Sequence, residues 1–202
     1  MTIPFGPYDG YLSDPSAFNG ILILLREPNT RGAAPEGFWM RDVVVAHHGK
    51  RGGKSYYDKL SKYVEFLGST LENCAFSNLN LSGGYGAAGQ GYQDSLLQFR
   101  TPDWNHHAWR LLLDDRIKII LTVWDIANAI FSAMKNYSPE EVTGFSIGKR
   151  KEQKYPRELR AFQFTPEGSA RRKTVYTIYH PSARGKNSYT ASDIGPKKLS
   201  TP

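Results

Sequence analysis

The chain has 202 residues, of which 40% are hydrophobic, and a chain of this length most often forms one domain. Its 26 Lys and Arg exceed its 19 Asp and Glu, which gives a net charge of +7 and a pI near 9.4. The surplus lies in residues 149–202, which hold 13 basic and 4 acidic groups. This charge favours a polyanionic partner and says nothing about the fold.

Cysteine content and hydropathy exclude further classes. The single cysteine, Cys74, excludes an internal disulfide, a four-cysteine zinc site and a four-cysteine iron–sulfur cluster. No apolar run reaches the ~18 residues of a membrane-spanning helix, and the N-terminus lacks the regions of a signal peptide. We therefore expect a soluble protein of a reducing compartment, cytoplasmic and, in a bacterium, associated with the nucleoid.

Strands and helices are predicted to alternate along the chain. Short apolar runs bounded by Gly, Pro or Asp are typical of buried strands, and apolar residues three and four apart are typical of helices. Most of the strands are continuously apolar, as parallel strands covered on both faces are. The pattern predicts an α/β fold, a three-layer α/β/α sandwich with a short, mostly parallel central sheet. In chain order, strands are predicted at 20–25, 42–46, 73–79, 117–123 and 174–179, and helices at 55–67, 94–97, 105–113 and 124–135.

A single domain is expected over residues 1–202, with two basic segments that depart from the alternation. Residues 148–173 hold nine Lys and Arg and are interpreted as an inserted loop or hairpin. Its aromatic residues Tyr155, Phe162 and Phe164 either stack on unpaired bases or pack on the core. From about residue 185 the chain is polar and rich in Ser, Lys and Gly, which predicts an irregular basic tail.

Three polar segments each follow directly after a predicted strand, where open α/β sheets bind their ligands. If these strands run parallel, the Glu27 carboxylate, the Asn78 carboxamide and the His180 imidazole converge on one edge. Together they can position a water molecule, read a polar edge and stabilise a leaving anion. Taken singly, each also has an ordinary structural interpretation, as a strand end or a loop amide.

In order and spacing, these segments resemble the motifs of the uracil-DNA glycosylase superfamily, most closely its single-strand-selective and mismatch-specific branches. The likeness covers the chain from about residue 20 to residue 184 and includes the strand and helix at 117–131. Three motifs carry it: the first is LREPN at 25–29 followed by GFW at 37–39, the second is FSNL at 76–79 and the third is HPSAR at 180–184.

The resemblance implies an enzyme that flips a nucleotide out of the DNA stack and hydrolyses its N-glycosidic bond. It implies that Glu27 activates the water and that His180 donates a hydrogen bond to the departing base. Phe38 would stack under the flipped base, and Asn78, with Asn80 beside it, would bind the base's Watson–Crick edge. No lysine lies within the motifs to form a Schiff base, so the expected product is an abasic site.

DNA-backbone contacts are expected from two kinds of residue. The resemblance implies that Ser182 and the segment holding Arg184 and Lys186 grip phosphate and fill the gap left by the base. Basic charge alone points to Arg171 and Arg172, and Lys54 at a predicted helix start is interpreted either as a phosphate contact or as part of a solvated helix cap.

The expected partner is DNA, single- or double-stranded, with no membrane, no cofactor and no metal, and we expect a monomer. Two pairs of adjacent histidines, 47–48 and 106–107, lack metal-ligand spacing and favour surface or capping roles.

Two residues depart from the pattern of the resembling branches. Glu27 stands where Asp or Asn is usual, which moves the water, and Leu25 stands where glycine is common, which adds a side chain beneath the active-site loop. A long glycine-rich loop with aromatic residues follows at 83–92. These features leave three alternatives open: a repair enzyme for uracil or a deaminated base, an enzyme for enlarged or hypermodified pyrimidines such as those of some viral DNA, and an inactive glycosylase-like module that binds damaged or single-stranded nucleic acid.

Overall fold

The computed structural model describes residues 9–26, 56–81, 90–137, 143–146 and 160–178. The predicted strand at 42–46 and the glycine-rich loop at 83–92, except for its last three residues, lie outside the described residues. The elements in chain order are β1 (Gly10–Tyr11), η1 (Pro15–Ala17), β2 (Ile21–Leu25), α2 (Tyr56–Phe66), η2 (Leu71–Asn73), β3 (Ala75–Asn78), α3 (Gln90–Phe99), α4 (His107–Leu112), β4 (Ile119–Val123), α5 (Trp124–Tyr137), β5 (Thr143–Ser146), β6 (Arg160–Phe164) and β7 (Lys173–Ile178).

All seven described strands form one sheet in the order β1-β3-β2-β4-β7-β6-β5. The four inner strands β3, β2, β4 and β7 are parallel to one another. β1 is antiparallel to β3 at one edge, and β6 and β5 continue antiparallel from β7 at the other. The predicted α/β class is therefore confirmed, with a parallel centre and antiparallel flanks.

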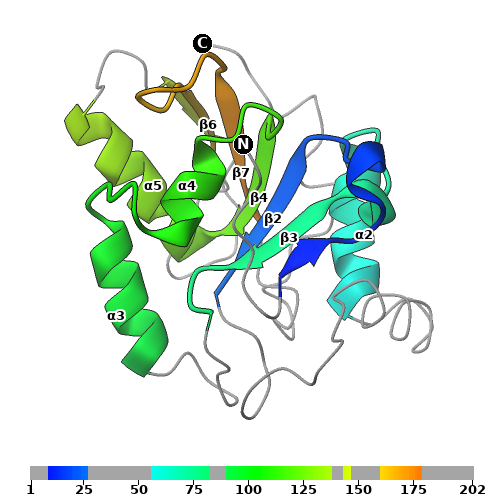
Figure 1. Cartoon of the computed structure of the whole chain (residues 1–202), viewed down its shortest axis with the longest axis horizontal. Coiled ribbons are helices and arrows are strands. Elements are labelled where there is room, and N and C mark those ends of the chain that lie inside the picture. The colour runs from blue at the N-terminus through cyan, green and yellow to red at the C-terminus, as the bar shows by residue number, and fades with distance from the viewer. Residues whose placement is uncertain (1–8, 27–55, 82–89, 138–142, 147–159, 179–202) are drawn as a thin grey trace.

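The helices cover both faces of this sheet. The connection from β2 through α2 to β3 moves in one direction along the sheet, and the connection from β3 through α3 and α4 to β4 moves in the other. Because such crossovers are right-handed, the two sets of helices lie on opposite faces. Figure 1 shows α3, α4 and α5 on one side of the sheet and α2 on the other, which completes the three layers. None of the helices in the described ranges is long and apolar enough to cross a membrane.

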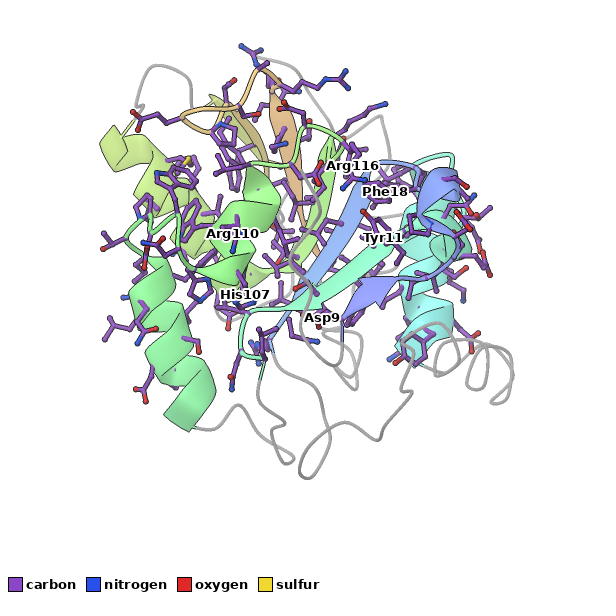
Figure 2. All side chains as sticks on the ribbon, viewed as in Figure 1. Asp9, Tyr11, Phe18, His107, Arg110 and Arg116 are labelled. Atoms are coloured by element: carbon purple, nitrogen blue, oxygen red, sulfur yellow. The ribbon has the colours of Figure 1, made fainter. Side chains whose placement is uncertain are left out.

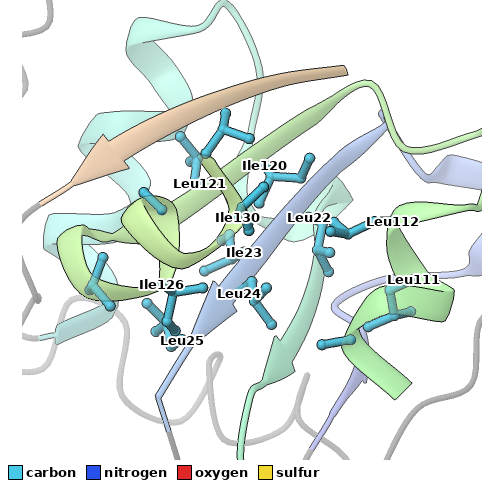
Figure 3. Packing of buried hydrophobic residues seen from close by; sticks show 14 of the residues in the cluster. Leu22, Ile23, Leu24, Leu25, Leu111, Leu112, Ile120, Leu121, Ile126 and Ile130 are labelled. Carbon is cyan, nitrogen blue, oxygen red and sulfur yellow. The ribbon is translucent and has the colours of Figure 1, made fainter. Parts of the chain in front are cut away.

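The core is built around β2, whose five residues are all buried. A strand with neighbours on both sides and helices on both faces has no solvent-facing positions, which explains its unbroken apolar sequence. Leu25, at 1% exposure, belongs to the same hydrophobic cluster as Leu22 and Ile126 (Figure 3). The side chain that departs from the glycosylase pattern at this position is therefore accounted for by core packing.

The helices begin and end close to the predicted residues except for α3. The buried stripe of α2 is formed by Leu60, Tyr63 and Val64, and the helix is followed by Gly68 at φ +75°, a conformation that favours glycine. α3 starts at Gln90, four residues before the predicted start at residue 94. The predicted helix began too late because the first turn of α3 contains Gly91 and polar residues, which carry little helical signal.

The basic segment at 148–173 contributes to the sheet rather than standing apart from it. β6 pairs with both β5 and β7, and Phe162 and Phe164 are each 1% exposed. The Phe162 ring meets the Phe131 ring of α5 edge-on at 5.3 Å between centroids. Phe162 and Phe164 thus pack on the core, and the interpretation that they stack on unpaired bases is wrong. Tyr155 lies outside the described residues.

Candidate functional site

Four parallel strands end at the same edge of the sheet, which we call the carboxyl rim. Arg26, the residue after β2, is the last described residue before Glu27. β3 ends at Asn78, and β7 ends at Ile178, two positions before His180. The expectation that the three motif-bearing strands are parallel is confirmed, so the motifs follow strands that end at one rim.

At this rim, Asn78 is held by a carboxylate from the N-terminal strand. β1 pairs antiparallel with β3, with Gly10 opposite Phe76, so the preceding Asp9 comes beside the end of β3. The Asn78 backbone N–H and side-chain Nδ2 donate to Asp9 Oδ1 at 3.1 and 2.9 Å. Ser77 Oγ donates to Asp9 Oδ2 at 2.9 Å. Asn78 is 3% exposed, so these bonds form in a largely water-free environment.

His107, the first residue of α4, completes the cluster. Its Nε2 lies 2.7 Å from the Asn78 carbonyl oxygen, and because a carbonyl only accepts, Nε2 carries the hydrogen. Burial raises the pKa of Asp9 and lowers the pKa of His107. We call these residues the Asp9–Asn78–His107 cluster, and Figure 2 shows Asp9 and His107 near the carboxyl rim.

Arg26 and the neighbouring strand β4 hold the end of β2 in place at the carboxyl rim. Arg26 forms an ion pair with Asp125 in the first turn of α5, at 2.9 Å from guanidinium nitrogen to carboxylate oxygen. Its carbonyl oxygen accepts from the Asn80 backbone N–H at 2.9 Å. Thr122 Oγ donates to the Leu24 carbonyl at 2.6 Å and fixes β4 against β2. The chain is thus anchored at Arg26, directly before Glu27.

A shallow hollow lies between α5 and the strands β6 and β7, lined by Trp124, Phe131, Phe162 and Thr177 among others. It has no room for a water molecule. The Thr177 hydroxyl is buried and has no hydrogen-bond partner in the described part of the chain. This hollow is a packing gap and offers no space for a base.

The structure separates the expected site residues into two groups. Asn78 and Asn80 lie together at the carboxyl rim. Arg171 and Arg172 are exposed in the turn between β6 and β7, at the amino end of β7. Six residues of strand separate them from the rim, about 20 Å at the usual rise. Outside the described residues lie Glu27, Phe38, Lys54, His180, Ser182, Arg184 and Lys186.

Lys173, the last basic residue of the segment at 148–173, is not available to phosphate. It is fully buried, and its Nζ donates to the carbonyl oxygens of Asp114 and Ile117 at 2.7 and 2.8 Å. Burial lowers its pKa to about 8. The side chain holds the turn before β4, at the end of the sheet opposite the carboxyl rim.

Asp9 and His107 are site residues that the sequence did not reveal. Their hydrogen bonds to β3 join residues 68, 69 and 29 positions apart, and no local pattern encodes such contacts. His106, by contrast, has the capping role favoured for the histidine pairs, because its Nδ1 accepts from the Ala108 N–H at 3.2 Å at the start of α4. No group of three potential metal ligands occurs within the described ranges.

No protein-family model, no curated protein and no solved structure matches the chain. The fold defines an α/β protein with polar side chains gathered at the carboxyl ends of parallel strands, where sheets of this kind bind ligands.

Proposed function

We propose that the chain is a monofunctional DNA glycosylase, which hydrolyses the N-glycosidic bond of a flipped uracil, deaminated or modified pyrimidine and leaves an abasic site. One observation carries the proposal: β2, β3 and β7 are parallel and end at one rim. The first motif begins at the end of β2, the second forms the end of β3 and the third follows β7. The buried, hydrogen-bonded Asn78 at this rim supports a base-reading role.

In the proposed reaction, Glu27 accepts a proton from a water molecule whose oxygen attacks C1′ of the deoxyribose. The C1′–N bond breaks, and its electron pair leaves with the base. His180 donates a hydrogen bond to the base as negative charge develops. Phe38 stacks against the base while Asn78 binds its edge, with Asn80 adjacent. No cofactor or metal is assigned to this hydrolysis.

The proposal divides DNA binding between two regions. Phosphates next to the flipped nucleotide are assigned to Ser182, Arg184, Lys186 and Lys54. Arg171 and Arg172 lie at the opposite end of β7, so they are assigned salt-dependent contacts to DNA away from the reacting base. The protein acts as a monomer on single- or double-stranded DNA.

Product analysis tests the reaction type. Oligonucleotides carrying uracil, hypoxanthine, hydroxymethylcytosine or glucosylated cytosine, each single- and double-stranded, are incubated with the protein and resolved with and without alkali. The proposal predicts strand breakage only after alkali, because an abasic site forms without enzymatic strand cleavage. Glu27→Gln abolishes this product and His180→Ala slows its formation by orders of magnitude. Glu167→Gln, which alters an exposed carboxylate in the turn between β6 and β7, leaves it unchanged.

The substrate then identifies the biological role. Cleavage at uracil or hypoxanthine supports repair, and cleavage only at a bulky modified cytosine supports restriction of foreign DNA. The alternative function, an inactive module that binds damaged or single-stranded nucleic acid, is favoured by the presence of Glu27 where the resembling branches have Asp or Asn. DNA binding that survives both substitutions, without any product from the parent protein, would favour this module.

A further inference from the structure

We propose that Asp9 is a positioning residue that locks the Asn78 carboxamide in one orientation, and that this lock makes the site discriminate between the keto and amino edges of a pyrimidine. The inference rests on the proposed base-reading role of Asn78, and it adds the residue that determines the selectivity of that reading.

The lock follows from which atoms can donate. Asp9 Oδ1 is 2.9 Å from the side-chain nitrogen of Asn78 and 3.1 Å from its backbone nitrogen. A carboxylate oxygen accepts hydrogen bonds, so a flipped carboxamide would place its oxygen against another acceptor. Protonation of Asp9 does not release the lock, because Oδ1 already accepts two N–H groups, the proton falls on Oδ2, and the Ser77 hydroxyl there can accept as well as donate.

The rest of Asn78 is also held in place. Its backbone carbonyl oxygen accepts a hydrogen bond from His107 Nε2 at 2.7 Å, and only 3% of the residue is exposed to solvent. The carboxamide nitrogen of Asn78 donates to Asp9 Oδ1. We assign its side-chain oxygen and its second amide hydrogen to the flipped base, which supplies one donor and one acceptor for these two groups.

The consequence for selectivity comes from the pattern of the base edges. A uracil-type edge presents the O4 acceptor beside the N3–H donor, and a cytosine-type edge presents the N4 donor beside the N3 acceptor. A carboxamide free to rotate by 180° matches either edge. A locked carboxamide matches only one, because the other edge brings donor against donor and acceptor against acceptor. By fixing the orientation of the carboxamide, Asp9 therefore determines which of the two base edges Asn78 binds.

Three substitutions separate the lock from general stability. Asp9→Ala removes the acceptor of both Asn78 bonds. Asp9→Asn keeps it, because the new side-chain oxygen accepts the same two N–H groups and the new amide donates to Ser77 Oγ. Ser77→Ala is the matched control, since it removes the third hydrogen bond of Asp9 and leaves the two to Asn78 in place.

Binding of non-cleavable probes tests the selectivity. The probes are single-stranded oligonucleotides with one 2′-fluoro-2′-deoxyuridine or one 2′-fluoro-2′-deoxycytidine, because the fluorine slows glycosidic cleavage and permits equilibrium measurement. We expect the wild-type dissociation constants to differ by about tenfold or more, and the ratio to fall within about twofold of one in Asp9→Ala but to persist in Asp9→Asn and Ser77→Ala. A wild-type ratio near one, or a ratio unchanged in folded Asp9→Ala, would overturn the inference.

Nuclear magnetic resonance of the DNA-free protein tests the lock independently of any glycosylase function. The two Nδ2 hydrogens of Asn78 are assigned by their loss in Asn78→Ser, and one of them is expected to exchange slowly with solvent. Asp9→Ala abolishes this protection and Asp9→Asn preserves it. Failure to bind DNA with the protection present would refute the proposed function alone, whereas rapid exchange of both hydrogens in the wild type would refute the lock even if Asp9→Ala did not fold.

Discussion

The buried Lys173 makes the stability of the protein depend on pH in a direction that the structure determines. Its side chain is fully buried, and its Nζ donates to two backbone carbonyls of the turn before β4. Burial lowers its pKa from 10.5 to about 8, against the smaller opposing effects of Asp115 and Asp114 and with a small contribution from Arg171 in the same direction. The folded protein therefore releases the lysine proton at a lower pH than the unfolded chain does.

The size and sign of the effect follow from this difference. Between pH 8 and 10.5 the unfolded chain retains the proton that the folded protein has lost, so the free energy of unfolding rises with pH in this window. A drop of the pKa from 10.5 to about 8 corresponds to about 3 kcal/mol. Lys173→Met removes the titrating group, so it removes this rise.

Urea unfolding of the wild type and Lys173→Met at pH 7.5 and pH 10.5 measures the effect. Subtracting the two proteins cancels the titration of every other group, and we expect the wild type to gain about 3 kcal/mol relative to the variant between these pH values. Arg172→Met, a substitution of an exposed neighbour in the same turn, is the control: it keeps Lys173, so the wild type shows no gain relative to it. A wild-type gain equal to that of Lys173→Met would refute the argument that this lysine is buried and depressed in pKa.

Four further outcomes are expected. Phe162→Ala destabilises the protein by about 3–5 kcal/mol in urea unfolding, because the side chain is 1% exposed and packs on Phe131; a loss below about 1 kcal/mol would contradict its place in the core. His106→Asn keeps the cap of α4 but removes a pH dependence of stability. Burial lowers the pKa of His106 to about 4, so the stability contributed by the neutral imidazole is complete above pH 6.5 and is lost as the pH falls toward 4. Thermal unfolding of the wild type and the variant across this pH range measures the effect. The double charge reversal Arg171→Glu and Arg172→Glu weakens DNA binding and lowers its salt dependence, but it leaves the rate of base release at saturating DNA unchanged because both residues lie far from the carboxyl rim; a fall in that rate would place them near the base. His180→Ala lowers single-turnover base release by orders of magnitude with little change in DNA affinity, and loss of folding in this variant would instead give the histidine a structural role.

The fold was predictable because its signals are local. The apolar run of β2 reflects burial on both faces, and the apolar stripe of α2 reflects burial on one face. The predicted ends of β2, β3, β4 and β7 lie within two residues of the observed ends. The hairpin of β5 and β6 was harder to predict. The segment that contains β6 is rich in basic residues, and only the alternation of Phe162 and Phe164 with Gln163 and Thr165 marks a strand that pairs with β7.

The candidate site was predictable only in part, for a physical reason. Asn78 is the last residue of β3, so its position at a strand end places it at the rim. Asp9 and His107 reach it through the antiparallel pairing of β1 and the start of α4, and neither contact leaves a trace in the local sequence. Lys173 shows a similar limit, because it belongs to the basic segment at 148–173, and nothing in the local sequence indicates that the fold buries it against backbone carbonyls.

We propose above that the rim at which β2, β3 and β7 end releases a base from DNA. The most direct measurement is mass spectrometry of the free base under single-turnover conditions, with wild-type protein and Glu27→Gln on the same panel of uracil-containing, deaminated and modified oligonucleotides. We expect a free base of one identifiable mass from the wild type and none from Glu27→Gln. No free base from any oligonucleotide, with folded wild-type protein, would contradict it.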